Sequence, residues 1–442
     1  MQSAPPELLM EPPAETWAGL VGHDTSERAR RFRERLGLPT DGPVVMSGHQ
    51  AQIWHPGILS KYLAAAGAGE ALHAHPAWLV VDQDTGNPLR VRSAQVGEDG
   101  SARAGVVDLG IGEGPGVNQP LGLAPSARIV ASCPEVVRPI GEALRAHEGA
   151  SSLSEQVQGA LEDLLAPITA PIQRVRALSV RQTELFAEVV ARMADDPGSC
   201  QASYNRAASE RPEARVRALK PGDARSGVEL PLWDIRSGER RRVYASDLAG
   251  VDPADLAPRG LLMTGLMRLA GCDLFIHGTG GGAYDRVTDA WFEAWLGERP
   301  GAPSVVVSAT IRLEGVGGSD EVERAERLAW RAHAARHNPE LLNDPDVSAR
   351  KRELVERIRS APPGERAALF REMHDLLDRH RRGHAEELAA LDAAAREASL
   401  RAADARRISE IARDRTLPFP MYPQERLTAL RGAIRDGLGL GR

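Results

Sequence analysis

Three polar stretches of the sequence each follow a short apolar run, and together they carry the residues that could do chemistry. The first, residues 47–57, reads Ser-Gly-His-Gln-Ala-Gln-Ile-Trp-His-Pro-Gly and lies between a predicted strand and a predicted helix. Gly48 would let a ligand approach the backbone closely. His49, Gln50 and His55 could donate hydrogen bonds to an anionic substrate or take part in proton transfer. The alternative is that these polar groups only cap and brace the turn.

The second stretch, Asp82-Gln83-Asp84, ends the next apolar run. Two carboxylates two residues apart at a strand end point to one side of the sheet. There Asp82 and Asp84 could hold a divalent cation on phosphates, bind an amine or act as a base. The alternative is ordinary turn chemistry, because residues 84–87 (Asp-Thr-Gly-Asn) are typical of a turn.

The third stretch, residues 277–285, is a glycine-rich link between a strand and a helix. Its glycines fit a loose G-x-G-x-x-A pattern, but a dinucleotide site also needs an acidic residue at the end of the following strand. That strand ends in Ser308-Ala309-Thr310. We therefore predict a turn that holds an anion, with His277 handling a proton or an oxyanion. The predicted substrate-binding residues of this turn are Gly278, Gly280, Gly281, Gly282 and Tyr284.

Two histidine pairs have a spacing that can bind zinc on a helix: His333 with His337, and His380 with His384. The sequence shows no third ligand for either pair, and arginines surround both. We therefore predict no metal-ligating residues. A Walker motif, a G-x-S-x-G elbow and an H-E-x-x-H motif are all absent from the sequence, which argues against several large enzyme classes.

The composition limits the possible partners. The 442 residues carry 55 Lys and Arg against 61 Asp and Glu, a formal net charge of −6, and only 4% are aromatic. Both values argue against a nucleic-acid-binding protein. Three separated cysteines indicate a reducing compartment. The N-terminus lacks the regions of a signal peptide, and charges interrupt the longest apolar stretch. We therefore expect a cytoplasmic protein with no membrane span.

The order of apolar runs predicts the elements that position these stretches. A strand over 43–47, a helix over 58–66 and a strand over 76–81 form a βαβ unit, which places ligands at the carboxyl ends of its strands. Strands are also predicted at 272–277 and 304–308, with a helix from about 284 to 296 between them.

This pattern predicts the α/β class, with a discontinuous core. The expected parts are a core of residues 1–131 and 220–317, a helical connecting insert at 132–219, a helical domain at 318–416 and a C-terminal segment at 417–442 that docks on the core.

A seven-residue repeat runs through the predicted helical domain. The recurring positions are Phe370, Leu377, His384, Leu391, Ala398 and Ala405. Such a repeat is typical of a long helix in a coiled-coil-like hairpin or across a dimer. We therefore predict a homodimer formed through residues 320–412.

Four segments, in the same order along almost the whole chain, resemble the bacillithiol biosynthesis cysteine-adding enzymes. Residues 47–57, followed by a helix with Lys61, are similar to that family's Gly-Gln-Gln-Ala turn, Gly-Pro and Tyr/Lys helix. Residues 78–84 resemble its strand ending in Glu-Asp-His-Asp, and residues 277–284 lie where it has a Gly-Gly-Pro-Gly-Glu turn. Residues 419–427 resemble its Phe-Pro…Gln-Glu-Arg ending.

The resemblance implies a Rossmann-like parallel-sheet core with a helical insertion and a C-terminal α-helical, coiled-coil-like domain that dimerises. It also implies a ligase that joins cysteine, or a similar amino acid, to a small sugar conjugate through an amide bond. The implied catalytic residues are His49, Asp82, Asp84 and His277. ATP or ADP, with Mg²⁺, are the cofactors we consider.

Two alternatives remain open at this stage. One is a metal-dependent nucleotide or nucleotide-sugar transferase, because an Asp-x-Asp at a strand end suits Mg²⁺. The other is a non-catalytic dimeric scaffold with a degenerate core. The transferase would need a divalent metal and Asp82 for its activity. The scaffold would bind neither a nucleotide nor a thiol precursor.

Overall fold

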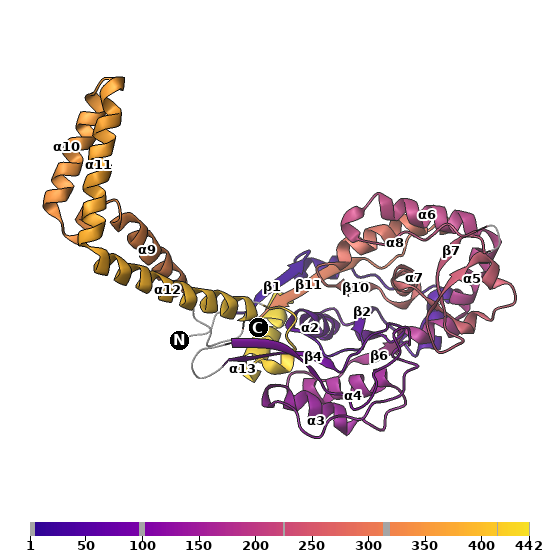
Figure 1. The fold of residues 1–442 in the computed structure, drawn as a ribbon. Helices are drawn as coiled ribbons and strands as arrows, with labels where there is room; N and C mark the ends of the chain where they lie inside the picture. The colour runs from indigo at the N-terminus through magenta and orange to yellow at the C-terminus, as the bar shows by residue number, and fades with distance from the viewer. Residues whose placement is uncertain (1–4, 97–101, 224–225, 313–318, 413, 442) are drawn as a thin grey trace. The chain divides into compact units, whose positions relative to one another are not determined.

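The computed structural model describes residues 5–96, 102–223, 226–312, 319–412 and 414–441 (Figure 1). The chain divides into two compact units. The larger unit comprises residues 1–94, 104–312 and 415–442, and the helical unit comprises residues 95–103 and 313–414. The predicted core boundary at 317–318 lies outside the described residues.

A six-stranded mixed sheet forms the centre of the larger unit. The edge strand β1 is antiparallel to β11, and every other neighbouring pair is parallel. In spatial order the strands are β1 Glu7–Glu11, β11 Ser304–Thr310, β10 Leu274–His277, β2 Val44–Gln50, β3 His75–Val81 and β6 Gln173–Arg176. The predicted α/β class is therefore confirmed as a mixed α/β fold.

Helices pack around this sheet. Two smaller sheets follow, of which the two-stranded one has residues in both units. The helices are α1 Glu27–Leu36, α2 Pro56–Ala71, α3 Arg138–Ala146, α4 Leu153–Leu165, α5 Glu184–Asp195, α6 Pro197–Ser209, α7 Gly260–Leu266, α8 Gly281–Leu296 and α13 Gln424–Gly437. The smaller sheets consist of β7 Glu229–Asp234, β8 Arg241–Tyr244 and β9 Leu256–Pro258, and of β4 Arg90–Val96 paired with β5 Ala102–Asp108.

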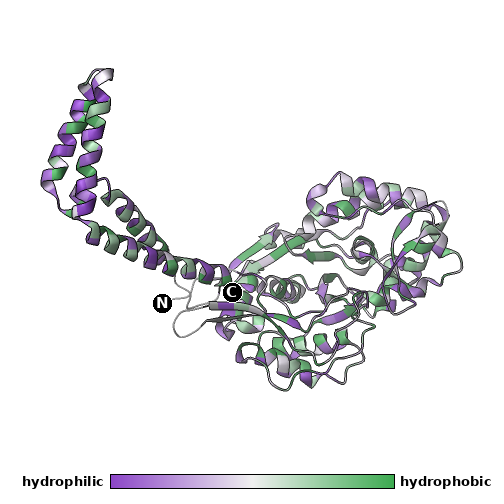
Figure 2. Ribbon diagram, in the orientation of Figure 1, coloured by the Kyte–Doolittle hydropathy of each residue, from purple (hydrophilic) through white to green (hydrophobic). Residues whose placement is uncertain are grey.

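The central elements are apolar because they are covered on more than one side. Val44, Val45 and Met46 of β2 are completely buried, as expected for a parallel strand with both faces covered. Helix α2 starts with Pro56 at its first position, where the missing N–H costs no hydrogen bond. Figure 2 shows the central strands and α2 largely in the hydrophobic colour.

Four helices form the helical unit: α9 Ser319–Ala335, α10 Pro345–Ser360, α11 Pro363–Gly383 and α12 Ala385–Ala412. Helix α12 packs on α9 through small side chains, with Ala398 and Ala402 against Ala325. Figure 1 shows α11 and α12 meeting at an angle. Small clusters of buried apolar side chains, rather than one large core, therefore hold this unit together.

Two sequence predictions about regularity are wrong. The segment 132–219, predicted to be helical, contains β6, which joins the main sheet beside β3. The seven-residue repeat does not run along one long helix, because the helix ends at Gly383 and a new one starts at Ala385. Glycine at this point weakens continuation of the helix.

No helix within the described residues has both the length and the apolar character that crossing a bilayer requires.

Candidate active site

A pocket of about 640 Å³ opens at the carboxyl ends of β2 and β10. From β2 the chain passes through α2 to β3 on one side of the sheet, and from β10 it passes through α8 to β11 on the other side. The two crossovers therefore diverge between these adjacent strands. Open α/β sheets bind ligands at such a point, because the loops leave a crevice there.

The structure brings eight of the twelve predicted site residues to this pocket. They are His49, Gln50, His55, His277, Gly278, Gly280, Gly281 and Tyr284. The other four, Gly48, Gly282, Asp82 and Asp84, do not line it. Lys61, Ser308 and Arg415 line the pocket as well and were not predicted as site residues.

Gly48 is required by strand packing and does not face the pocket. A Cβ at this position would lie 2.5 Å from the backbone oxygen of Leu79 on the neighbouring strand, so only glycine fits. The prediction that Gly48 lets a ligand approach the backbone is therefore corrected: the missing side chain allows β3 to pack closely against β2. The result of this close packing is that His49 and Gln50 reach the strand end in a fixed register.

His49 is a neutral hydrogen-bonding group in this pocket. Burial, together with Lys61 and His55, lowers the pKa of His49 to about 2. Its Nε2 atom lies 2.9 Å from Nε2 of Gln52, and the amide is the donor in this pair. The imidazole proton is then on Nδ1. His49 can donate a hydrogen bond to an oxyanion, but it is too weak a base to accept a proton near neutral pH.

His55 is the N-cap residue of α2, and its capping hydrogen bond determines which ring nitrogen carries the proton. Its Nδ1 atom accepts a hydrogen bond of 3.0 Å from the backbone N–H of Gly57, which caps the helix. The proton of the neutral ring is therefore on Nε2. The capping interpretation of this residue is correct, and it coexists with a place in the pocket wall.

Lys61 is the functional candidate that the sequence prediction missed. Its Nζ donates a 2.6 Å hydrogen bond to the backbone oxygen of Gly48 and lies 5.5 Å from the ring centre of Trp78. Burial lowers the pKa of its ammonium to about 7. The available signal was its rarity, because the sequence has only three lysines and this one follows the first polar stretch by four residues.

His277 is oriented by a buried carboxylate. Its Nε2 atom lies 2.8 Å from Asp285 Oδ2, and Arg268 lies 3.5 Å from the same oxygen. Burial acts to raise the pKa of Asp285, but His277 and Arg268 outweigh it and lower that pKa below its usual value. Asp285 therefore stays ionised and holds the imidazole in one orientation. A histidine and carboxylate in this arrangement can transfer a proton.

The four glycines of the turn, Gly278, Gly280, Gly281 and Gly282, have different surroundings, so a side chain would have a different effect at each position. A Cβ at Gly281 would lie 2.3 Å from the His277 side chain, so this glycine allows the histidine to pack on the helix start. Gly282 faces Val306 at an ordinary distance, away from the pocket. At Gly280 a Cβ would meet nothing within 4 Å, and at Gly278 only Lys61 at 3.8 Å. Gly278 and Gly280 therefore keep space open at the pocket.

The turn also leaves a helix N-terminus facing this space. Helix α8 starts at Gly281, three residues before the predicted start at Tyr284, and Gly280 supplies no side-chain cap. Its first N–H groups carry the positive end of the helix dipole. Burial raises the pKa of Tyr284, so its phenol remains a neutral O–H group beside them.

Asp82 and Asp84 are held by arginines away from the pocket. Asp82 is completely buried, with Arg176 Nε 2.7 Å from its Oδ2 and the N–H of Leu178 2.9 Å from its Oδ1. Asp84 pairs with Arg240 at 3.1 Å. Since each carboxylate already has a cationic partner, the predicted role as a metal or amine ligand is replaced by one in bracing the loops.

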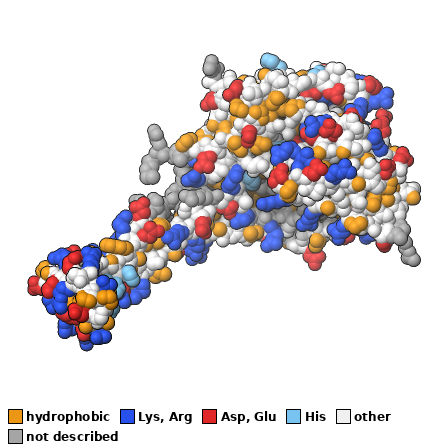
Figure 3. Space-filling model, turned by 90° about the horizontal axis from the view of Figure 1, so that it is seen from above, with side chains coloured by type: hydrophobic (Ala, Val, Ile, Leu, Met, Phe, Trp, Pro, Cys, Tyr) orange, Lys and Arg blue, Asp and Glu red, His pale blue; other side chains and the backbone are white. Residues whose placement is uncertain are grey.

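The pocket thus combines hydrogen-bond donors and cations around open space. Arg415 donates to Ser308 Oγ at 2.6 Å on its rim. On the face that Figure 3 shows, acidic and basic side chains are interspersed without a broad surface of one sign. The donors described above all line one pocket, which suits a small anionic ligand better than a long polyanion.

Comparison of the chain with protein-family models and with curated protein sequences gave no match.

Proposed function

We propose that this chain is an enzyme that joins cysteine, or a similar amino acid, to a small carboxylate-bearing sugar conjugate through an amide bond. The observation that best supports this is the pocket where the β2 and β10 crossovers diverge. It combines a carboxylate-oriented histidine, a lysine of lowered pKa and an open helix N-terminus.

Each of these groups fits a step of amide formation. Carboxylates of the sugar conjugate would bind at the α8 N-terminus and Arg415. His277, oriented by Asp285, would accept the proton that the attacking amine loses as the new C–N bond forms. Lys61 and the Nδ1–H of His49 would stabilise the negative charge on the carbonyl oxygen. ATP with Mg²⁺ would supply the activation of the carboxyl group. The group that leaves as the C–N bond forms would then be phosphate, with ADP as the other product, or AMP, with diphosphate as the other product.

The same proposal covers the architecture implied by the family resemblance. The larger unit would correspond to the Rossmann-like core, and the α9–α12 unit to the coiled-coil-like domain through which two copies pair. The parallel strands β10, β2 and β3 with crossover helices support the first assignment. The exposed Trp330, Phe370 and Leu400 support the second, because large apolar side chains are often covered in an assembly.

The test is a direct search for the product. The full chain is incubated with cysteine, glucosaminyl-malate, ATP and Mg²⁺, and mass spectrometry measures the amide conjugate. Thermal-shift measurements with each component separately identify which one binds. We expect His277→Asn and Lys61→Met each to lower the rate by about 100-fold or more. The first variant loses the proton-transfer group, and the second loses a group that stabilises the oxyanion.

A matched control is available in the same unit. His147 lies 2.9 Å from Asp163, outside the pocket, so His147→Asn removes a similar pair and should keep full activity. Absence of product together with absence of any thermal shift would refute the proposal. Equal losses in His147→Asn and His277→Asn would show that the effect is on folding alone.

A further inference from the structure

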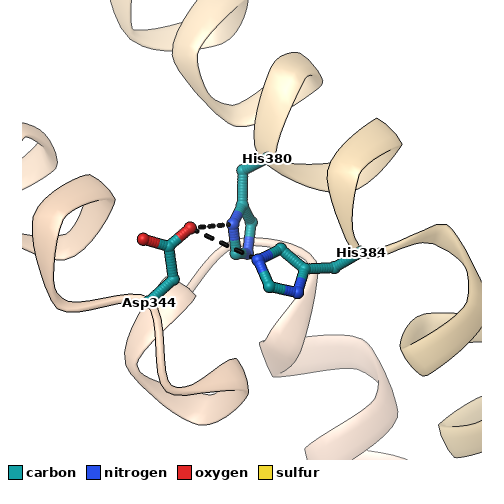
Figure 4. Close-up of side chains that lie close together, drawn as sticks. All are labelled: Asp344, His380 and His384. Atoms are coloured by element: carbon teal, nitrogen blue, oxygen red, sulfur yellow. Dashed lines mark hydrogen bonds and ion pairs between the residues drawn. The ribbon is translucent and has the colours of Figure 1, made fainter.

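An aspartate and two histidines converge in the helical unit, separately from the pocket described above (Figure 4). Asp344 Oδ2 lies 2.9 Å from His380 Nδ1 and 3.4 Å from His384 Nε2. The other carboxylate oxygen, Oδ1, accepts a 3.2 Å hydrogen bond from the backbone N–H of Val347 and caps α10. One oxygen is therefore used by the helix, and the other faces both imidazoles.

The sequence prediction found no third ligand for this histidine pair, and the fold supplies one. Asp344 is 36 residues before His380, so only the packing of the start of α10 on the end of α11 brings them together. Within the described parts of the chain, no other three His, Cys, Asp or Glu residues place ligand atoms within 4.8 Å of one another. Among the described residues, no carboxylate completes such a group with the equally spaced pair His333 and His337.

The residues around the two histidines restrict their orientation in a way that favours binding of a cation. The His380 side chain is completely buried, which fixes its ring. Glu387 Oε2 lies 3.2 Å from His384 Nδ1. A carboxylate behind a ligating histidine holds the tautomer in which the other nitrogen is free to bind metal.

We propose that Asp344 Oδ2, His380 Nδ1 and His384 Nε2 form a site for one Zn²⁺ or a similar divalent transition-metal ion, with water as a further ligand. Nitrogen and oxygen ligands lie 2.0–2.2 Å from zinc, so neighbouring ligands of a tetrahedral ion are about 3.3 Å apart. The observed 2.9 Å and 3.4 Å are close to this value. His384 and Asp344 remain partly exposed, which gives the ion a route to solvent.

This site would join three elements of the helical unit. Asp344 precedes α10, His380 is in the last turn of α11, and His384 lies between α11 and α12. An ion bound there would link the start of α10 to the junction between α11 and α12, where the seven-residue repeat is interrupted. The inference does not depend on the proposed enzymatic function, because it uses no residue of the pocket.

The test is metal binding by the full chain after removal of metals with a chelator. Zn²⁺ is titrated calorimetrically, and Co²⁺ is added separately because its visible absorption reports four-coordinate geometry. We expect one equivalent to bind. Asp344→Asn should weaken binding by more than about 100-fold, since it removes a ligand, while asparagine still caps α10. Glu387→Gln should weaken it by about 10- to 100-fold.

The matched control is the double variant His333→Ala and His337→Ala, which removes an equally spaced histidine pair and should retain full affinity. Circular dichroism verifies that each variant is folded. Absence of Zn²⁺ binding to the native chain would overturn the proposal. Unchanged affinity in Asp344→Asn, or equal loss in the His333 and His337 control, would overturn it as well.

Discussion

Both units of the molecule place a histidine within hydrogen-bonding distance of an aspartate, but the surroundings of the two carboxylates differ. In the larger unit, Arg268 lies 3.5 Å from Asp285 and shares it with His277. In the helical unit, Asp344 faces two imidazoles and its second oxygen caps a helix. A permanent cation accompanies the first carboxylate, whereas the side chains paired with the second are two imidazoles, which can lose their protons.

This difference shows how the same combination, a histidine beside an aspartate, can suit either proton transfer or metal binding. A guanidinium remains charged at any working pH, so it occupies the place of a metal ion and leaves the carboxylate to orient a histidine. An imidazole can instead offer a lone pair to a metal once its nitrogen is free of a proton. The same argument applies to Asp82 and Asp84, because each of these carboxylates is already paired with an arginine.

The largest expected effect comes from removing the guanidinium of the first pair. Arg268→Met would leave Asp285 buried without its permanent cation, which typically costs about 3–5 kcal/mol of stability. Chemical denaturation of the variant measures the free energy of unfolding. Arg286→Met, which removes an exposed arginine of α8, is the control and should change stability by less than about 0.5 kcal/mol. A small effect for Arg268→Met would mean that Asp285 does not depend on its cation.

A second prediction concerns how the backbone holds the histidine of the larger unit. Gly281→Ala would place a methyl group against His277, so it should cost about 1–3 kcal/mol and displace the imidazole. Gly280→Ala meets open space and should change the free energy of unfolding by less than about 0.5 kcal/mol. Denaturation curves of the two variants provide the measurement. Equal costs would show that the turn has no specific contact with His277.

The smallest effect distinguishes the buried lysine of the larger unit from the exposed lysine of the helical unit. The pKa of Lys61 is about 7 in the folded chain, against 10.5 for the ordinary side chain. Between these values the unfolded chain binds more protons, so stability rises with pH. From pH 7 to about 8.5 the native chain should gain about 1.5 kcal/mol relative to Lys61→Met.

Guanidinium denaturation at the two pH values measures this gain. Lys351→Met is the control, because the Lys351 ammonium is exposed and bound to the backbone oxygen of His337. A constant difference for Lys61→Met would contradict the lowered pKa of Lys61.

The sequence by itself determined the class of the fold, the βαβ unit and the positions of most polar strand ends. An apolar run such as 44–46 is typical of a covered strand, and Pro56 is favoured at the first position of a helix, so local physical chemistry predicts the βαβ unit. The polar residues after such strands meet at one edge of a parallel sheet, which is why His49, Gln50 and His277 were predicted together.

Only the tertiary structure decided what those residues contact. Arg176 reaches Asp82 across 94 residues, Asp344 meets His380 across 36, and Lys61 becomes buried through the packing of α2 on the sheet. The chemistry of a side chain depends on its charge partners and its exposure to water. Both are properties of long-range packing, which no local pattern in the sequence encodes.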